Sequence, residues 1–372
     1  MIWLLILIIV LIIGLNLISH RMSAFHLREA PLGVKPIQEN SINSIRLKVT
    51  DRCPWQCNFC HDEGWRSTSD VSWTNELGDA LIAIRSVLPT INSVHETGGE
   101  PTTNRHICEF NRQLAAHGFS VKMTTNGQFD AGKLTDLVAS GVQSFNFSIL
   151  SLDPERFLAL QQGRGTTWRD GGHISGNALP EAQHHVFAHF NRDWAQRQID
   201  QQLAMALAAR KLNVSVKVNT VVSSYSDISN AWDVYVWAKQ NSIALRLMND
   251  LANGQESIDA IERFIGAIGG REISRHAERG TSTCKTAYQD KDGYEFAFKQ
   301  IRNQKLKVMC AECPRMNNGT CTESFYGIRL QQDPSGTIYV ILCIQESNTS
   351  TQMTVPEFLS SPHLKELQGY NH

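Results

Sequence analysis

The sequence lacks an excess of charge of either sign, and this absence argues against one class of partner. It has 35 Lys and Arg residues against 36 Asp and Glu residues, which gives a formal net charge of −1 at pH 7. Proteins that mainly bind nucleic acid usually carry a basic excess, so we expect no nucleic-acid partner. Internal repeats and low-complexity tracts are also absent. With 42% hydrophobic and 19% charged residues, the 372 positions suffice for a globular α/β domain and a smaller module.

Long apolar runs are missing except near the N-terminus. Residues 2–18 are apolar apart from Asn16, and Arg21 follows shortly. No basic segment precedes this run and no small-residue cleavage site follows it, so a cleaved signal peptide is not expected. The run is at the short end for a membrane helix, and the positive flank after it favours keeping the rest of the chain in the cytoplasm. We interpret residues 1–21 either as an anchor on the cytoplasmic face of a membrane or as a misassigned start before Met22.

Cysteines are few and odd in number, nine in all, and they are grouped. This pattern fits metal ligation in a reducing compartment better than a disulfide framework. Cys53, Cys57 and Cys60 have the spacing C-x3-C-x2-C directly after an apolar alternating stretch. Three such thiolates can hold three irons of a [4Fe–4S] cluster, and without a fourth local cysteine one iron would stay open. A zinc knuckle or buried thiols are the alternatives, although no paired C-x2-C or H-x3-H follows nearby to complete a tetrahedral zinc site.

From residue 43 onward, short β-like runs alternate with amphipathic helical patterns. Such alternation predicts parallel strands joined by crossover helices. The expected strands are 44–49, 92–97, 120–124, 143–149, 214–222 and 244–248. The expected helices are 75–87, 107–117, 133–140, 194–211 and 231–240. These strands are too few for a complete eight-stranded barrel, so we expect an α/β fold, a partial (βα)6 TIM-like barrel, with its site at the carboxyl ends of the strands.

A second motif, Gly-Gly-Glu-Pro at residues 98–101, follows the second expected strand. Glycines let the backbone approach a ligand closely, and a carboxylate at a strand end can accept from an ammonium group. Together with the cysteine spacing and with Phe59 before the third cysteine, this motif resembles the radical S-adenosylmethionine (radical SAM) superfamily. The resemblance implies that the open iron binds the amine and carboxylate of SAM. It also implies these SAM-binding residues: Phe59, Gly98, Gly99, Glu100 and Ser148.

Further matches resemble the GTP 3',8-cyclase (MoaA) branch, which acts in molybdenum-cofactor biosynthesis. They are Thr-Thr-Asn-Gly at 124–127, Asn-Phe-Ser-Ile-Leu-Ser-Leu-Asp at 146–153 and Lys-Val-Asn at 217–219. The resemblance implies that a reduced cluster cleaves SAM to a 5'-deoxyadenosyl radical, which abstracts hydrogen from a small-molecule substrate. An electron donor such as flavodoxin or ferredoxin would then be a partner. The positions that the resemblance assigns to the nucleotide are Arg46, Thr124 and Lys217.

Four more cysteines lie toward the C-terminus, at Cys310, Cys313, Cys321 and Cys343. In the resembling family, a C-x2-C…C pattern there holds a second, auxiliary [4Fe–4S] cluster whose open iron touches the substrate. Cys310, Cys313 and Cys343 could do the same, and Cys321 could close that cluster; a zinc site is the alternative. We therefore expect four parts: a hydrophobic segment 1–21, a linker 22–42, a radical SAM core 43–270 and an auxiliary-cluster module 271–372.

Three departures from the cyclase pattern fall at the substrate end. His95 stands four residues before Gly99, where the cyclases have an arginine; the chain ends Gln-Gly-Tyr-Asn-His without a Gly-Gly tail; and Cys321 is additional. The SAM-side residues are retained, so we expect the same radical chemistry on a nucleotide-like or other small polar substrate. A peptide-modifying maturase is the second candidate. A membrane-tethered iron–sulfur electron carrier or scaffold is a third, although such a carrier would need no Gly-Gly-Glu motif.

Overall fold

The structure is a computed structural model that describes residues 35–55, 57–60, 70–161, 190–302, 304–333, 335–345 and 351–370. The hydrophobic segment 1–21 and most of the linker 22–42 lie outside these residues, so the predictions made for them stay predictions. In the part of the chain that is described, no helix has the length and apolar character needed to cross a membrane.

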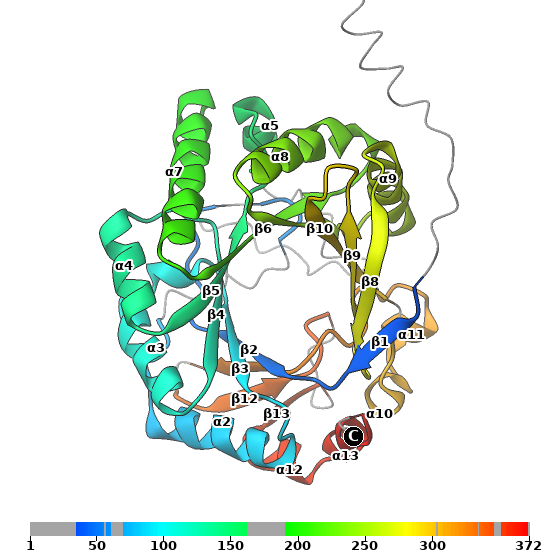
Figure 1. Cartoon of the computed structure of the whole chain (residues 1–372). Helices are drawn as coiled ribbons and strands as arrows, with labels where there is room; N and C mark the ends of the chain where they lie inside the picture. The colour runs from blue at the N-terminus through cyan, green and yellow to red at the C-terminus, as the bar shows by residue number, and fades with distance from the viewer. Residues whose placement is uncertain are drawn as a thin grey trace, which may run out of the picture.

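One sheet curls into a ring of strands, and the helices pack around its outside (Figure 1). The strand order is β1-β8-β9-β10-β7-β6-β5-β4-β3-β2-β11-β12-β13. The strands are β1 (Ile37–Asn40), β2 (Ser44–Lys48), β3 (Ser93–Thr97), β4 (Ser120–Thr125), β5 (Val142–Ser148), β6 (Ser215–Val222), β7 (Ala244–Asn249), β8 (Arg271–Glu278), β9 (Thr283–Gln289), β10 (Glu295–Ile301), β11 (Arg329–Gln332), β12 (Ile338–Ile341) and β13 (Gln352–Thr354).

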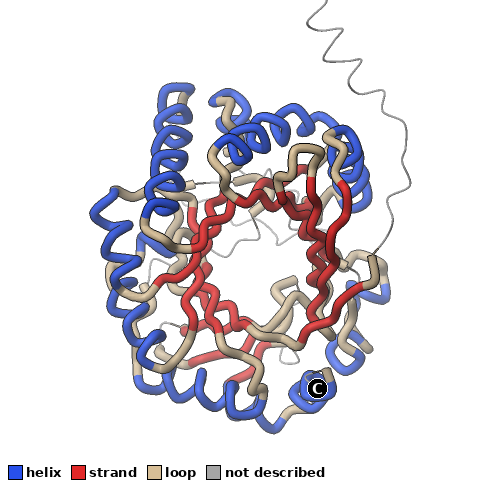
Figure 2. Tube along the Cα trace, in the orientation of Figure 1, coloured by secondary structure: helices blue, strands red, loops and turns tan. Residues whose placement is uncertain are grey.

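The helices form an outer layer, which Figure 2 shows in blue around the red strands. They are α2 (Asn75–Val87), α3 (Ile107–Ala116), α4 (Ala131–Ala139), α5 (Pro154–Leu160), α7 (Arg192–Lys211), α8 (Ile228–Gln240), α9 (Gly254–Ala267), α10 (Lys307–Cys310), α11 (Pro314–Asn317), α12 (Val355–Ser360) and α13 (Pro362–Gly369), with 3-10 turns η1 (Pro101–Thr103) and η3 (Tyr225–Asp227).

Strands β2 to β7 are neighbours in chain order, and each pairs in parallel with the next. They coincide with the six expected strands, and α2, α3, α4, α7 and α8 coincide with the five expected helices. The prediction of an α/β fold built on parallel strands with crossover helices is therefore confirmed.

The sheet continues beyond these six strands at both edges. At one edge β10 pairs in parallel with β7, and β9, β8 and β1 follow. At the other edge β11 pairs in parallel with β2, and β12 and β13 follow in antiparallel pairing. The predicted boundary between 43–270 and 271–372 falls between α9 and β8, within one continuous sheet, and the division into two parts stays a prediction.

Burial alternates along the strands because successive side chains point to opposite faces. In β2, Ile45 and Leu47 are fully buried and Arg46 between them is half-buried; in β4, Val121 and Met123 are buried on either side of half-buried Lys122. The buried apolar residues belong to the core that includes the helices. The polar positions between them line the inside of the ring, where the site is built.

Candidate functional site

The loop that carries Cys53, Cys57 and Cys60 follows β2 and is anchored by Trp55. The Trp55 ring meets Phe157 of α5 edge-on at 5.0 Å, and its Nε1 donates to Oε1 of Gln198 in α7 at 2.9 Å. Phe59 and the first two cysteines pack against this same small apolar cluster. The loop is therefore fixed to two helices outside the strands.

The three thiols of the loop are close neighbours. The Cys60 backbone N–H donates to the Cys57 carbonyl at 3.1 Å, and Gln161 Nε2 donates to Cys57 Sγ at 3.3 Å. Burial raises the pKa of the Cys53 thiol, and Cys57 and Cys60 raise it further. Three adjacent thiolates need positive charge beside them, and a [4Fe–4S] cluster with one open iron is a group that suits such a donor set.

Within the described residues, no three Cys, His, Asp or Glu side chains already converge as ligands of a single metal ion. A cluster does not require that convergence, because each cysteine binds a different iron.

The glycine turn after β3 lies directly on the cysteine loop. Gly99 N donates to the Thr50 carbonyl at 3.0 Å, and Glu100 N donates to the Arg52 carbonyl at 2.7 Å. A Cβ on Gly98 would come within 2.3 Å of the Thr50 oxygen, and Gly98 has a φ of +132°. Only glycine permits this approach of two backbones, which explains the residue type at this position.

Glu100 is buried, and its carboxylate is occupied by donors from the protein. Oε1 accepts from Thr102 Oγ1 and from Thr125 Oγ1, each at 2.7 Å, and Oε2 accepts from Asn126 N at 2.6 Å. Burial raises its pKa, while these hydrogen bonds act in the opposite direction. The side chain therefore ties the end of β3 to the end of β4.

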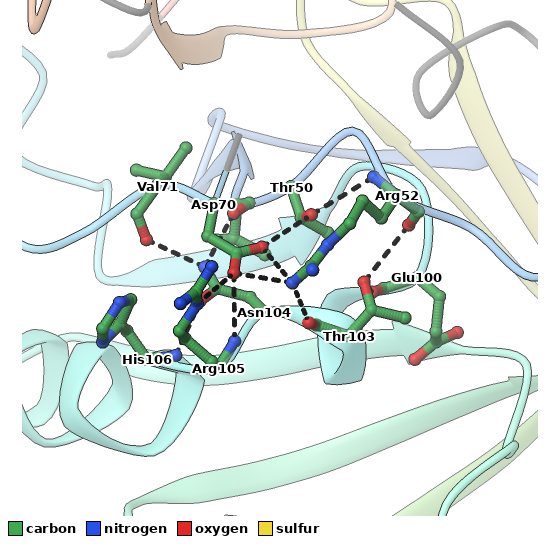
Figure 3. A network of polar contacts seen from close by, with 10 residues as sticks. Thr50, Arg52, Asp70, Val71, Glu100, Thr103, Asn104, Arg105 and His106 are labelled. Carbon is green, nitrogen blue, oxygen red and sulfur yellow. Dashed lines mark hydrogen bonds and ion pairs between the residues drawn. The ribbon is translucent and has the colours of Figure 1, made fainter. Parts of the chain in front are cut away.

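A polar network braces the entry to the cysteine loop (Figure 3). Asp70, whose side chain is 5% exposed, accepts from Arg52 at 2.6 Å and from Thr50 Oγ1 at 3.2 Å. Arg52 also donates to the Thr103 carbonyl, and Arg105 Nε reaches Asp70 at 3.3 Å. Because Arg52 directly precedes Cys53, this network holds the backbone from which the first cysteine projects.

Cationic side chains gather on the inner face of the ring. Strand register places Arg46 beside His95 and His95 beside Lys122, and it places Lys299 beside Lys285. Residues from opposite sides also act on one another, since Arg46 of β2 and Lys299 of β10 both lower the pKa of His95. The interior cations of the described chain include Arg46, Lys122, Lys217, Arg246, Lys285, Lys299 and Arg329, with the carboxylates of Glu278 and Glu323 among them.

Two of these cations belong to neighbouring strands and have no carboxylate partner in the described part of the chain. They are Lys217 of β6 and Arg246 of β7. Burial and the nearby Arg246 lower the pKa of Lys217 to about 8. Burial also lowers the pKa of Arg246. Half-buried cations of this kind favour an anionic ligand, which would restore the electrostatic stabilisation lost on leaving water.

His95 is a neutral member of this interior. Its Nε2 lies 2.8 Å from Thr124 Oγ1 and 3.1 Å from Asn146 Nδ2. Burial, followed by the charges of Arg46 and other cations, lowers its pKa well below the usual value. Asn146 Oδ1 is buried and has no hydrogen-bond partner among the described residues. His95, which the resemblance sets against an arginine of the cyclases, is thus an uncharged hydrogen-bonding group.

The C-terminal cysteines form a second group. Burial raises the pKa of Cys310, and the neighbouring Cys321 and Cys313 raise it further. The segment after Cys343 is tied to the segment after Cys321, since Gln345 Oε1 accepts from the Thr322 backbone N–H at 3.1 Å. The chain therefore brings these four cysteines into one region.

The two cysteine groups lie at opposite ends of β2. Cys53 follows the carboxyl end of β2. Cys343 follows β12, whose last residue, Ile341, pairs with the first residue of β11, Arg329. Because β11 runs parallel to β2, the position of Cys343 is on the amino-end side. The interior with Arg46 lies between the two groups.

The predicted SAM and nucleotide residues separate into two zones. The glycine motif and Ser148 stand at the carboxyl ends of β3 and β5, and the Ser148 carbonyl accepts from Gln202 Nε2 at 2.6 Å. Arg46, Thr124 and Lys217 lie on the inner face. Five residues of the inner face were not predicted from the sequence: Lys122, Arg246, Lys285, Lys299 and Tyr326. The alternation of polar and apolar residues around Lys285 in β9 and before Lys299 in β10 is the signal that could have indicated those two.

Comparison with known proteins shows which family has this cysteine loop and these parallel strands. Residues 47–223 match the Radical SAM superfamily. The chain carries a radical SAM domain. The match begins within β2, before the cysteine loop, and runs just past β6.

Curated relatives of this radical SAM domain are GTP cyclases. A probable GTP 3',8-cyclase of Thermococcus kodakarensis is 34% identical over 114 residues, which are 31% of this chain and 37% of that protein. A GTP 3',8-cyclase of Rhodopseudomonas palustris is 25% identical over 232 residues, 60% of this chain and 57% of that protein. This chain thus spans 37% and 57% of the lengths of these two relatives.

A solved structure shares the fold. Streptococcus suis SuiB bound to S-adenosylmethionine superposes with a TM-score of 0.53 at 13% sequence identity, covering 89% of this chain and 68% of that one. The predictions of a radical SAM enzyme resembling the GTP cyclases, and of a [4Fe–4S] cluster with SAM as cofactors, are confirmed by the family and its relatives. Which residues bind these cofactors stays a prediction.

Proposed function

We propose that this radical SAM protein reductively cleaves SAM to a 5'-deoxyadenosyl radical and abstracts hydrogen from an anionic, nucleotide-like substrate inside the ring. One observation carries the proposal. The glycine turn sits on the cysteine loop at the carboxyl ends of the strands, beside an interior rich in cations. In barrels of parallel strands, the carboxyl ends are where active sites are built.

Cys53, Cys57 and Cys60 would hold three irons of the first cluster. When bound, the cluster and SAM supply the electron and the organic radical. The turn at Gly98 and Gly99 lets backbone groups reach SAM, and buried amide atoms without partners in the described chain, Asn126 Nδ2 and Asn219 Oδ1, add polar contacts. Glu100 acts mainly by fixing the turn, because four protein hydrogen bonds already occupy its carboxylate.

The substrate would bind against the inner face. Lys217 and Arg246 supply charge, and an arginine can bind phosphate through two parallel hydrogen bonds. Arg46 and Thr124 lie on neighbouring parts of the same surface, together with neutral His95. An interior with this charge favours an anion over an uncharged peptide segment. The likeness to SuiB concerns the fold and gives no support to the peptide-maturase alternative.

The four C-terminal cysteines would hold a second [4Fe–4S] cluster on the amino-end side of β2. Cys310, Cys313 and Cys321 are electrostatic neighbours, which favours Cys321 as a ligand beside Cys343. The natural reductant would be a small electron-transfer protein such as flavodoxin or ferredoxin, in the cytoplasm. A carrier without catalysis would not need a glycine turn against the cysteine loop, so this alternative has less support.

The proposal is tested by anaerobic reconstitution with dithionite and SAM, followed by mass spectrometry of anionic metabolite mixtures. We expect 5'-deoxyadenosine, and one metabolite that is consumed only when SAM is present. Lys217→Met and Arg246→Gln should reduce that consumption while SAM cleavage without substrate continues. Lys211→Met, at the exposed end of α7, is the matched control and should behave as wild type. If the interior variants consume the metabolite normally, the assignment of the substrate to the interior is wrong.

A further inference from the structure

Tyr326 is a phenol surrounded by cations on the inner face of the ring. Lys299 Nζ lies 4.7 Å from its ring centroid, the Arg46 guanidinium 5.0 Å and the Arg329 guanidinium 5.6 Å. Lys299 Nζ also donates a hydrogen bond to Tyr326 Oη. These cations come from β10, β2 and β11, so three strands converge on one side chain.

The surrounding charges favour the phenolate. Burial alone would raise the pKa of Tyr326, but Lys299 and Arg46, with Arg246 from β7 adding to them, lower it to about 8. The Arg329 guanidinium also forms a salt bridge with Glu323 Oε1, at 2.8 Å. Glu278 of β8 is a further charged group of this interior: burial raises its pKa, and Lys299 and Lys122 lower it. Phenol and phenolate are therefore both available near neutral pH.

We propose that Tyr326 is a further acid–base residue of the substrate site: it takes up a proton when an anion binds to Arg46, Lys299 and Arg246, and presents that proton to the bound substrate. The inference depends on the anionic substrate proposed above. An anion that pairs with these cations withdraws the charge that stabilises the phenolate. The proton comes from solvent, an O–H bond forms at Oη, and no electron is transferred. When the anion leaves, the proton returns to solvent.

The coupling is reciprocal, because linked binding equilibria affect one another equally. If one proton is taken up with each anion, the affinity for the anion should fall about tenfold per pH unit above the midpoint of Tyr326. A phenol that only supports the arginines by packing would show no such linkage.

The test uses the full chain with its clusters reconstituted, under anaerobic conditions, and tripolyphosphate as the anion. The difference in near-ultraviolet absorbance between wild type and Tyr326→Phe isolates one phenolate among seven tyrosines. The absorbance of this phenolate should appear in a pH titration with a midpoint near pH 8, and it should disappear on addition of saturating tripolyphosphate. Lys299→Met should move the midpoint toward the ordinary value of 10.0. Tyr225→Phe is the control, because Tyr225 also has a guanidinium over its ring, Arg263 at 5.5 Å, but is 46% exposed on the outside.

Three results would each overturn the inference. The first is a difference spectrum without a phenolate near pH 8, and the second is a midpoint that Lys299→Met leaves unchanged. The third is a phenolate that persists at a tripolyphosphate concentration shown by calorimetry to saturate the protein. SAM cleavage in the same samples reports on the proposed function separately: its absence contradicts that function, while the spectrum still decides the role of Tyr326.

Discussion

A Cβ on Gly99 would lie 2.0 Å from the carbonyl oxygen of Arg52 and 3.0 Å from the Cβ of Cys53. The turn after β3 and the start of the cysteine loop are thus in backbone contact, with no room for a side chain. This contact relates two motifs that are about forty residues apart in sequence, and it sets the position of the first cysteine relative to the SAM-binding turn.

Gly99→Ala should displace the cysteine loop, because the methyl group would collide with backbone atoms that cannot rotate away. We expect a large loss of bound iron and of SAM cleavage. Gly266→Ala is the control, since Gly266 lies in α9 and an added methyl group would meet no heavy atom within 4 Å beyond its own turn of the helix; it should keep both properties and stabilise the helix by at most about 1 kcal/mol. Normal iron content in Gly99→Ala would show that the loop does not depend on this contact.

Asp70→Asn should weaken the brace before Cys53. Hydrogen bonds from Arg105 and Thr50 and the charge of Arg52 lower the pKa of Asp70 despite its burial. Its stabilisation is therefore complete above the unfolded value of 3.8 and is lost as pH falls through the lower folded value. We expect a loss of about 1–3 kcal/mol at pH 7, measured by denaturant titration, and less bound iron.

The control for this brace is Asp136→Asn, on an exposed position of α4. It should change stability by less than about 0.5 kcal/mol. If Asp70→Asn binds iron and unfolds as the control does, the network does not position the cysteine loop.

The C-terminal cysteines predict a second cluster, and hence about eight irons per chain when both [4Fe–4S] clusters are present. Cys310→Ala with Cys313→Ala should reduce iron to about four per chain and leave SAM cleavage at the first cluster. Cys284→Ser, at a buried position of β9 outside both groups, is the control. Four irons in wild type, unchanged by the double variant, would remove the second cluster.

GTP should be a poor substrate although SAM cleavage is normal. Neutral His95 cannot replace an arginine on a phosphate, and each charge-assisted hydrogen bond lost costs about 1.5–3 kcal/mol. Purified, reconstituted protein should therefore convert little or no GTP, while Arg46→Ala and Lys217→Ala should impair the true substrate reaction more than they impair SAM cleavage. Efficient conversion of GTP to the cyclised molybdopterin precursor would restore the cyclase function.

The parallel part of the fold could be predicted because its strands and helices have different periods. Helix α2 has apolar Leu77, Leu81 and Ile84 at helical spacing behind the N-cap Thr74, and its observed bounds equal the expected ones. The strands β8, β9 and β10 were not predicted. Strand β9 has polar residues such as Lys285 and Thr286 on both faces, and the apolar part of β10 is limited to Phe296–Phe298 before Lys299, so neither segment has a long apolar run.

The candidate site could be predicted only where its residues lie close together in sequence or match a known motif. Cys53, Cys57 and Cys60 lie within eight positions, and the glycine motif was found by resemblance. The interior was found only in part, since Tyr326, in the segment before β11, meets Arg46 of β2 and Lys299 of β10 only once the sheet has formed. Distances between strands depend on register and on closure of the sheet, which a single sequence does not state.

The most direct test of the account is SAM cleavage by wild type and by the Cys53→Ala, Cys57→Ala, Cys60→Ala triple variant, reduced with dithionite under anaerobic conditions. The account predicts that wild type forms 5'-deoxyadenosine, and that the triple variant loses the iron of the first cluster and forms none. A triple variant that cleaves SAM as well as wild type does would contradict it.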